Sequence, residues 1–259
     1  MSLHVEVTGQ GEPLVMLHGW GMHGGIWSDV VAQLAEHYQV HCVDLPGYGK
    51  SKLPSAASGR GELDAVVDEL SARFDEPLNL CGWSLGGQIA LHWAACEPQK
   101  IKCLVLVTST PCFTERDDWP FGMPQHVLQQ FAADLEKNHT ATLRRFLGLQ
   151  VRGSEGEREL LASLRDCLFS RGEPDLEALR AGLNILRDAD QRAMLPKIGQ
   201  PTLVIAGERD KLTPPQASRY LAQTMPNARV VEIEGAAHAP FLSHRDKFLE
   251  SVLDFLCVR

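Results

Sequence analysis

The chain of 259 residues carries a formal net charge of −8, and 44% of its residues are hydrophobic. These values favour a folded domain with a sizeable core over a disordered chain, and the acidic balance disfavours a nucleic-acid-binding protein. No apolar run is long enough for a transmembrane helix, and the first residues lack the basic stretch and apolar run of a secretory signal, so neither segment is expected.

Short apolar runs that alternate with stretches of helical periodicity predict the secondary structure. The expected strands are Leu3–Thr8, Leu14–Leu17, Gln39–Asp44, Leu78–Cys81, Cys103–Thr108, Thr202–Ala206 and Val230–Ile233. The expected helices between and after them are Trp27–Tyr38, Leu63–Phe74, Leu85–Cys96, Pro215–Met225 and Lys247–Leu256. Several strands are continuously apolar, which is typical of parallel strands covered on both faces. The alternation therefore predicts an α/β fold with a mostly parallel central sheet flanked by helices.

The alternation is interrupted between about Pro111 and Pro196, where no strand pattern occurs. Helical periodicity in this stretch predicts His126–Lys137, Ala141–Val151, Glu157–Phe169 and Leu176–Arg187. We therefore expect a core formed by residues 1–110 and 196–259, with an inserted helical lid formed by residues 111–195.

The cysteines indicate the redox environment of the protein. Their number, seven, is odd, and the sequence contains no Cys-x-x-Cys motif. This usage predicts reduced thiols that pack as small hydrophobic side chains in a cytoplasmic protein.

The segment Gly82-Trp83-Ser84-Leu85-Gly86 has the form Gly-x-Ser-x-Gly. It follows the expected strand Leu78–Cys81 and precedes the expected helix Leu85–Cys96, which is the context of a nucleophile elbow. At such an elbow the serine occupies a sharp turn, and the flanking glycines give the backbone room to turn. Ser84 is therefore the candidate nucleophile.

A serine nucleophile needs a base and an acid that orients the base. His238 follows the last expected strand on a loop at the carboxyl edge of the sheet, where catalytic groups gather in open α/β folds. Asp210 follows the strand before it, which gives the chain order Ser, Asp, His of this type of fold. Asp210 is preferred as the acid, with Glu208 as its rival. Asp44 precedes the serine in the chain and is expected to be structural.

The segment His18-Gly19-Trp20-Gly21 follows an early strand and predicts part of an oxyanion hole. Two backbone N–H groups are needed where negative charge develops on the substrate oxygen. We expect them to come from Leu85, which follows the nucleophile, and from Trp20. His18 is expected to brace this loop.

No motif predicts a cofactor. Gly49-Lys50-Ser51 resembles the end of a phosphate-binding loop, but Asp44 stands where that loop requires glycine. No group of histidine, cysteine or acidic residues has the spacing of metal ligands. Neither a nucleotide nor a metal is therefore expected.

Taken together, the motifs resemble the α/β-hydrolase superfamily over essentially the whole chain, and within it the BioH family of biotin-pathway carboxylesterases. The segments that carry the narrower resemblance are His18–Gly21, Asp44–Ser51, Gly82–Gly87, Pro111–Phe113, Asp117–Pro120, Arg145–Leu147 and Ala236–Phe241. The combination of Trp83 with Asp117-Asp118-Trp119-Pro120 is the most specific part.

The resemblance implies that the substrate is the methyl ester of pimeloyl-[acyl-carrier protein], so that an acyl-carrier protein is the partner. Members of the family hold the carrier and its phosphopantetheine arm through lid arginines, which correspond here to Arg145 and Arg158. Two further basic positions of the family fall on Ala141 and Ala162, with Arg144 and Arg165 close by as possible substitutes. The acyl chain is expected to run under the lid past Trp83, Phe113, Phe146 and Leu147, although these side chains could equally serve lid-to-core packing.

Residues 144–171 contain six arginines against four acidic residues. An acidic carrier would meet this local basic patch, since the net charge of the whole chain repels it. The alternative is an ordinary solvated helix face. Two other functions stay open: a broad short-chain carboxylesterase without a carrier partner, and a catalytically silent member of the fold, which the three candidate catalytic residues disfavour. We expect a monomer that binds neither nucleic acid nor membrane.

Overall fold

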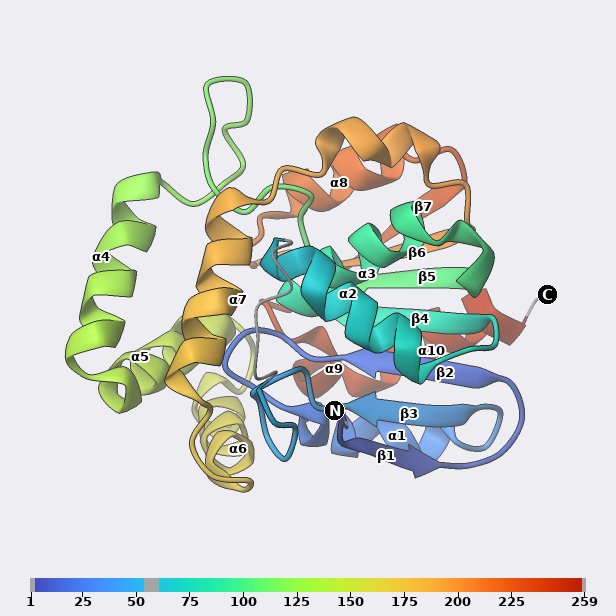
Figure 1. Cartoon of the computed structure of the whole chain (residues 1–259), viewed down its shortest axis with the longest axis horizontal. Coiled ribbons are helices and arrows are strands. Elements are labelled where there is room, and N and C mark those ends of the chain that lie inside the picture. The colour runs from blue at the N-terminus through green and yellow to red at the C-terminus, as the bar shows by residue number, and fades with distance from the viewer. Residues whose placement is uncertain (1–2, 54–60, 258–259) are drawn as a thin grey trace.

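The computed structural model describes residues 3–53 and 61–257, and within them seven strands form one sheet in the order β1-β3-β2-β4-β5-β6-β7 (Figure 1). The strands are β1 (Val5–Thr8), β2 (Pro13–Leu17), β3 (Gln39–Val43), β4 (Leu78–Trp83), β5 (Ile101–Val107), β6 (Thr202–Gly207) and β7 (Ala228–Ile233). Only β1 pairs antiparallel to its neighbour, and the other pairs in the described chain are parallel. The predicted mostly parallel sheet is confirmed.

Helices cover both faces of the sheet. Helices α2 (Glu62–Arg73), α3 (Leu85–Cys96) and α8 (Pro215–Thr224) lie on the near face in Figure 1, and α1 (Ser28–Leu34), α9 (Pro240–Ser243) and α10 (Arg245–Cys257) lie on the far face. Strands β4 and β6 are buried along their whole length, because both of their faces meet helices. This explains why their sequences are apolar without alternation.

Several bounds differ from those that the sequence predicts. Strand β4 continues through Gly82 and Trp83, because these residues still pair with Leu106 and Val107 of β5. The helix expected from Trp27 begins instead at Ser28, after a short 3₁₀ turn at Gly24–Trp27, and ends at Leu34. The short helix α9 was not foreseen.

Four helices fill the segment between β5 and β6. They are α4 (Gln125–Lys137), α5 (His139–Val151), α6 (Glu157–Phe169) and α7 (Leu176–Asp188), and they lie beyond the carboxyl ends of the parallel strands, at the left in Figure 1. We call residues 111–195 the insertion.

The entrance and exit of the insertion are held together by Trp119. Its side chain is 1% exposed, its indole N–H donates to the carbonyl oxygen of Cys112 at 2.8 Å, and its ring contacts Tyr220 of α8. The guanidinium of Arg192, at the exit, lies 5.4 Å from the centre of the Trp119 ring. The Asp-Asp-Trp-Pro motif therefore fixes the base of the insertion to the core.

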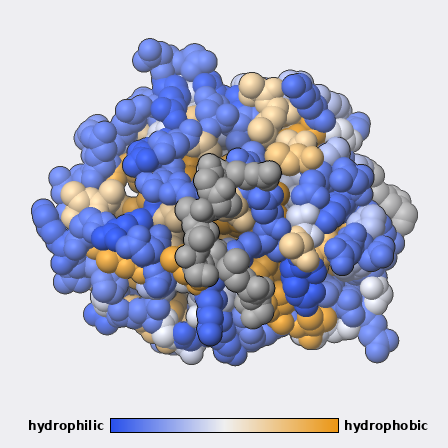
Figure 2. Space-filling model, in the orientation of Figure 1, coloured by the Kyte–Doolittle hydropathy of each residue, from blue (hydrophilic) through white to orange (hydrophobic). Residues whose placement is uncertain are grey.

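The surface of the view in Figure 2 is mainly hydrophilic, with small hydrophobic areas. None of the described helices has the length and apolar character needed to cross a membrane. All seven cysteines lie in the described part of the chain and are free thiols, but Cys96 and Cys257 are exposed. The expectation that the cysteines pack as small hydrophobic side chains is therefore wrong for these two.

Candidate active site

Ser84 lies at the turn between β4 and α3 in a backbone conformation that side chains rarely adopt, with φ 55° and ψ −117°. Its backbone N–H donates to the carbonyl oxygen of Val107 at 3.0 Å, which ties the turn to the end of β5. A Cβ atom on Gly82 would lie 2.3 Å from the oxygen of Gly86, and one on Gly86 would lie 2.5 Å from the oxygen of Leu17. The two glycines are therefore required by close backbone contacts, and the turn has the geometry of a nucleophile elbow.

His238 and Asp210 form a buried pair beside this turn. The Nδ1 atom of His238 lies 2.8 Å from Oδ2 of Asp210, and both side chains are almost wholly buried. The backbone N–H groups of Leu212 and Thr213 donate to the other carboxylate oxygen of Asp210. With Nδ1 facing a carboxylate, Nε2 is the nitrogen left to accept a proton.

The rival acid, Glu208, lies in a different environment. Its carboxylate accepts a hydrogen bond from the backbone N–H of Gly235 at 3.0 Å, and its side chain is half exposed. The structure therefore brings Asp210, and not Glu208, to the imidazole of His238.

The backbone of His238 is held by residues of β4 and α5 and by Thr108, which directly follows β5. The indole N–H of Trp83 and the hydroxyl of Thr108 donate to its carbonyl oxygen at 2.8 and 2.7 Å, and its own N–H donates to the carbonyl oxygen of Gln150 at 3.1 Å. Thr108 and Gln150 were missed by the sequence analysis, because neither belongs to a motif. Only the position of Thr108, at the end of an apolar strand, pointed to the sheet edge.

The loop after β2 lies against the serine, as its motif predicts. A Cβ atom on Gly19 would lie 3.2 Å from Cβ of Ser84, so the next residue, Trp20, is held close to the elbow. Leu85 is the first residue of α3, and its N–H has no partner within the helix. The backbone N–H groups of Trp20 and Leu85 thus come from the two segments that meet at Ser84.

His18 braces this loop with both ring nitrogens. Nε2 accepts from the N–H of Leu45 at 3.0 Å, so Nδ1 carries the proton and donates to the oxygen of Gly19 at 2.8 Å. Burial lowers the pKa of His18 to about 4, because the charged imidazolium is poorly solvated inside the protein. His18 is therefore a neutral structural residue at neutral pH.

An apolar pocket lies between α4, α5 and α7, above Trp20. Its lining includes Trp20, Phe113, Phe131 and Phe146, and the ring centres of Trp20 and Phe146 are 5.1 Å apart. Two residues expected along the acyl chain, Trp83 and Leu147, do not line this pocket. Trp83 is fully buried beneath the His238 loop against Phe241, and Leu147, although buried, does not line this pocket.

The arginines expected to meet a carrier lie on α5 and α6 and are exposed, but they have different partners. Arg145 donates to Asp134 of α4 at 2.6 Å, and the guanidinium of Arg144 lies 5.4 Å from the centre of the Phe169 ring. Arg158 and Arg165 lie along α6. Arg171 does not belong to this patch, because its side chain is 10% exposed and paired with Asp44.

Within residues 3–53 and 61–257, no cluster of three or more histidine, cysteine or acidic residues could hold a metal ion. The chemistry that the site supports from its own side chains is nucleophilic attack by a serine hydroxyl, with an imidazole as the proton acceptor.

Comparison with known proteins agrees with this geometry. Residues 12–245 match the alpha/beta hydrolase fold family. A pimeloyl-[acyl-carrier protein] methyl ester esterase of Nitrosomonas europaea is 45% identical over 96% of this chain and 97% of its own, and a protein of the same name from Chromobacterium violaceum is 44% identical over 99% and 98%. Among solved structures, an esterase from Exiguobacterium antarcticum has a TM-score of 0.88 and 27% identity, with 98% of this chain and 94% of that chain covered.

The low pKa of His18 predicts a loss of stability in acid. In the unfolded chain the imidazole takes up a proton near pH 6.5, whereas the folded state resists protonation until about pH 4. The contribution of His18 to the free energy of unfolding is thus fully present above pH 6.5 and is lost as the pH falls toward 4. At about 1.4 kcal/mol per pKa unit, the loss amounts to about 3 kcal/mol. Urea unfolding of wild type and His18→Asn at several pH values measures it. The variant should lose less stability across this interval, and equal losses would contradict the assignment.

Proposed function

Because the chain belongs to the alpha/beta hydrolase fold family, we propose that it is a serine esterase that hydrolyses the methyl ester of pimeloyl-[acyl-carrier protein] to the free carboxylate and methanol. The observation that carries the chemistry is the strained Ser84 elbow beside the buried pair of His238 and Asp210. The choice of substrate rests on relatives named pimeloyl-[acyl-carrier protein] methyl ester esterase, which are 41% to 45% identical over nearly the whole chain.

In the first step, the Oγ atom of Ser84 attacks the ester carbonyl carbon while Nε2 of His238 takes the hydroxyl proton. Asp210 keeps the imidazole in the required tautomer and stabilises the imidazolium that forms. The N–H groups of Trp20 and Leu85 stabilise the negative charge on the carbonyl oxygen. The bond to the methoxy group then breaks, His238 protonates the leaving oxygen, and methanol departs from an acyl-enzyme.

In the second step, a water molecule takes the place of the serine hydroxyl as the nucleophile. His238 takes a proton from the water molecule as its oxygen attacks the acyl carbon, and the same N–H groups hold the oxyanion. The bond to Oγ of Ser84 breaks, and the serine regains its proton from His238. The products are the carboxylate and the free enzyme, so no cofactor takes part.

The insertion acts in this proposal as the lid over the acyl chain. The apolar pocket lined by Trp20, Phe113 and Phe146 has a volume of about 40 Å³, so we propose that the helices of the insertion around it move apart to admit a chain of methylene groups. Arg145 and Arg158, assisted by Arg144, offer guanidinium groups to the phosphopantetheine phosphate and to the acidic carrier. Trp83 and Leu147 do not line this pocket.

We also propose a cytoplasmic location, which the free thiols fit, and no binding of nucleic acid, which the acidic chain fits. The enzyme is proposed to act as a monomer. A broad short-chain carboxylesterase on the same fold is the second candidate, since the elbow and the His–Asp pair would serve any ester that reaches them.

Substitutions in the candidate triad test the chemistry. Ser84→Ala and His238→Ala should each lower kcat by about three orders of magnitude or more, and the double variant should be hardly worse, because the residues act as a unit. Asp210→Asn should also be severe, whereas Glu208→Gln, the matched control on the same loop, should be mild. The measurement is turnover of p-nitrophenyl acetate by variants shown to be folded. The assignment would be contradicted if the losses of the two single variants multiplied in the double variant, or if Glu208→Gln lost more activity than Asp210→Asn.

Neutralising the exposed lid arginines tests the partner. Arg145→Gln combined with Arg158→Gln should raise KM for the carrier-bound ester about tenfold, roughly 1.4 kcal/mol, and leave p-nitrophenyl acetate turnover unchanged. Added salt should raise KM of the wild type, because the contacts are exposed and electrostatic.

The control for this experiment is Arg180→Gln, because Arg180 is another insertion arginine, paired with Glu136 and Glu177 on α4 and α7. It should change neither reaction. Equal losses for both substrates in the Arg145/Arg158 variant would make these arginines structural, and no change in either would place the carrier elsewhere.

A further inference from the structure

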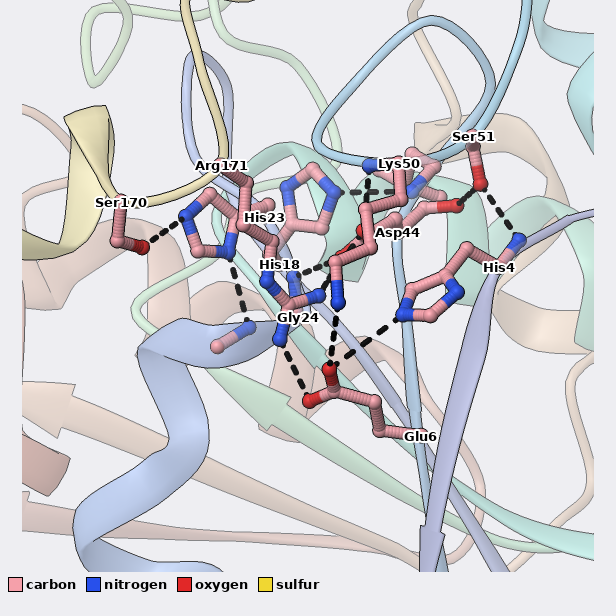
Figure 3. A network of polar contacts seen from close by, with 12 residues as sticks. His4, Glu6, His18, His23, Gly24, Asp44, Lys50, Ser51, Ser170 and Arg171 are labelled. Atoms are coloured by element: carbon pink, nitrogen blue, oxygen red, sulfur yellow. Dashed lines mark hydrogen bonds and ion pairs between the residues drawn. The ribbon is translucent and has the colours of Figure 1, made fainter.

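A network of polar contacts joins the segment after α6 to the core (Figure 3). Nη1 of Arg171 lies 2.8 and 3.0 Å from the two carboxylate oxygens of Asp44, and Nη2 lies 2.5 Å from Glu6. His23, beside them, faces the same turn of the insertion, because its Nε2 lies 2.7 Å from the carbonyl oxygen of Cys167. Arg171 is thus the charged residue through which the insertion reaches the end of β3.

Asp44 is the centre of this network and is completely buried. Its carboxylate accepts the backbone N–H of Gly24 at 2.7 Å and that of Lys50 at 2.8 Å, in addition to the guanidinium. Burial pushes the pKa of Asp44 upward, but the two N–H groups and the charge of Arg171 outweigh burial and hold the pKa below its ordinary value. Among the described residues, Arg171 is the one cationic side chain paired with the buried carboxylate of Asp44, and it comes from the insertion.

Asp44 and Leu45 hold the two ends of the loop that follows β2, which we call the oxyanion loop. We define this loop as residues 18–24. Gly24, at its end, donates to the carboxylate of Asp44, and His18, at its start, accepts from the N–H of Leu45. Between these points lie Gly19, against Ser84, and Trp20, whose N–H is the proposed oxyanion donor. The position of the loop therefore depends on the position of Asp44 and Leu45.

We propose that Arg171 is a positioning residue for the oxyanion loop, which it holds against Ser84 by neutralising and fixing Asp44. Without the guanidinium, the buried carboxylate keeps two neutral donors but no counter-charge, and it must draw in water or move toward solvent. Either response shifts Gly24, and with it the loop that carries Trp20. This role rests on the proposed esterase function, since an oxyanion donor has meaning only for that reaction.

The test is the turnover of p-nitrophenyl acetate per active site, with active sites counted by stoichiometric fluorophosphonate labelling. Arg171→Met should lower kcat per labelled site about tenfold or more with little change in KM, because a displaced oxyanion donor weakens transition-state binding more than substrate binding. Arg171→Lys, which keeps the charge, should recover most of the loss. Asp44→Asn combined with Arg171→Met should also recover it, because the amide is neutral and its oxygen can still accept the N–H of Gly24.

Arg180→Met is the matched control, since Arg180 pairs with Glu136 and Glu177 within the insertion and does not contact the oxyanion loop. It should leave kcat per labelled site unchanged. If Arg171→Met lowers only the yield or the unfolding midpoint, while kcat per labelled site stays at the wild-type value, the residue is merely structural and the proposal is overturned. If Asp44→Asn combined with Arg171→Met has no higher kcat per labelled site than Arg171→Met alone, Arg171 does not act through Asp44. A wild-type protein that is neither labelled nor active would overturn the proposed function itself, and this inference with it.

Discussion

The turn at Ser84 is the constraint on which the rest of the site depends. A serine with a positive φ at the junction of β4 and α3 is held there only because Gly82 and Gly86 allow backbone contacts too close for any side chain. The turn is also tied to the neighbouring strands, since the N–H of Ser84 donates to Val107 at the end of β5 and Gly86 lies so close to the end of β2 that a Cβ atom would meet the oxygen of Leu17. The carboxyl ends of the central strands, and the loops that follow them, are therefore placed around one hydroxyl group.

The insertion completes this site and does not simply cover it. The end of α5 accepts a hydrogen bond from the N–H of His238, and the hydroxyl of Ser154 accepts one from Ala237. The end of α6 reaches the opposite side through Arg171 and Asp44. The hairpin of α5 and α6, which carries the arginines proposed to meet the carrier, thus contacts the loop of the base on one side and the neighbour of the oxyanion loop on the other.

Much of the fold follows from local sequence, and what was missed depends on partners distant in the chain. The apolar runs that became β2 to β7, the elbow and the bounds of α6 could be predicted, because burial and helical periodicity leave direct marks in the sequence. Arg171, in contrast, looked like one more residue of a basic helix face. Its partner Asp44 lies 127 residues away, so only the folded chain shows that this arginine is buried and paired. Likewise, the sequence does not show that the indole N–H of Trp83 donates to the carbonyl oxygen of His238, 155 residues away.

The measurement that tests the account most directly compares one ester with and without its carrier. The purified protein is given the methyl ester of pimeloyl-[acyl-carrier protein] and, separately, the same methyl ester on a free pimeloyl chain, and kcat/KM is measured for both. A carrier-dependent esterase should show a kcat/KM about a hundredfold higher or more for the carrier-bound ester, roughly 2.7 kcal/mol of added transition-state binding, and the difference should shrink as salt is added. Equal kcat/KM values at all salt concentrations would contradict it and identify a broad esterase that needs no carrier.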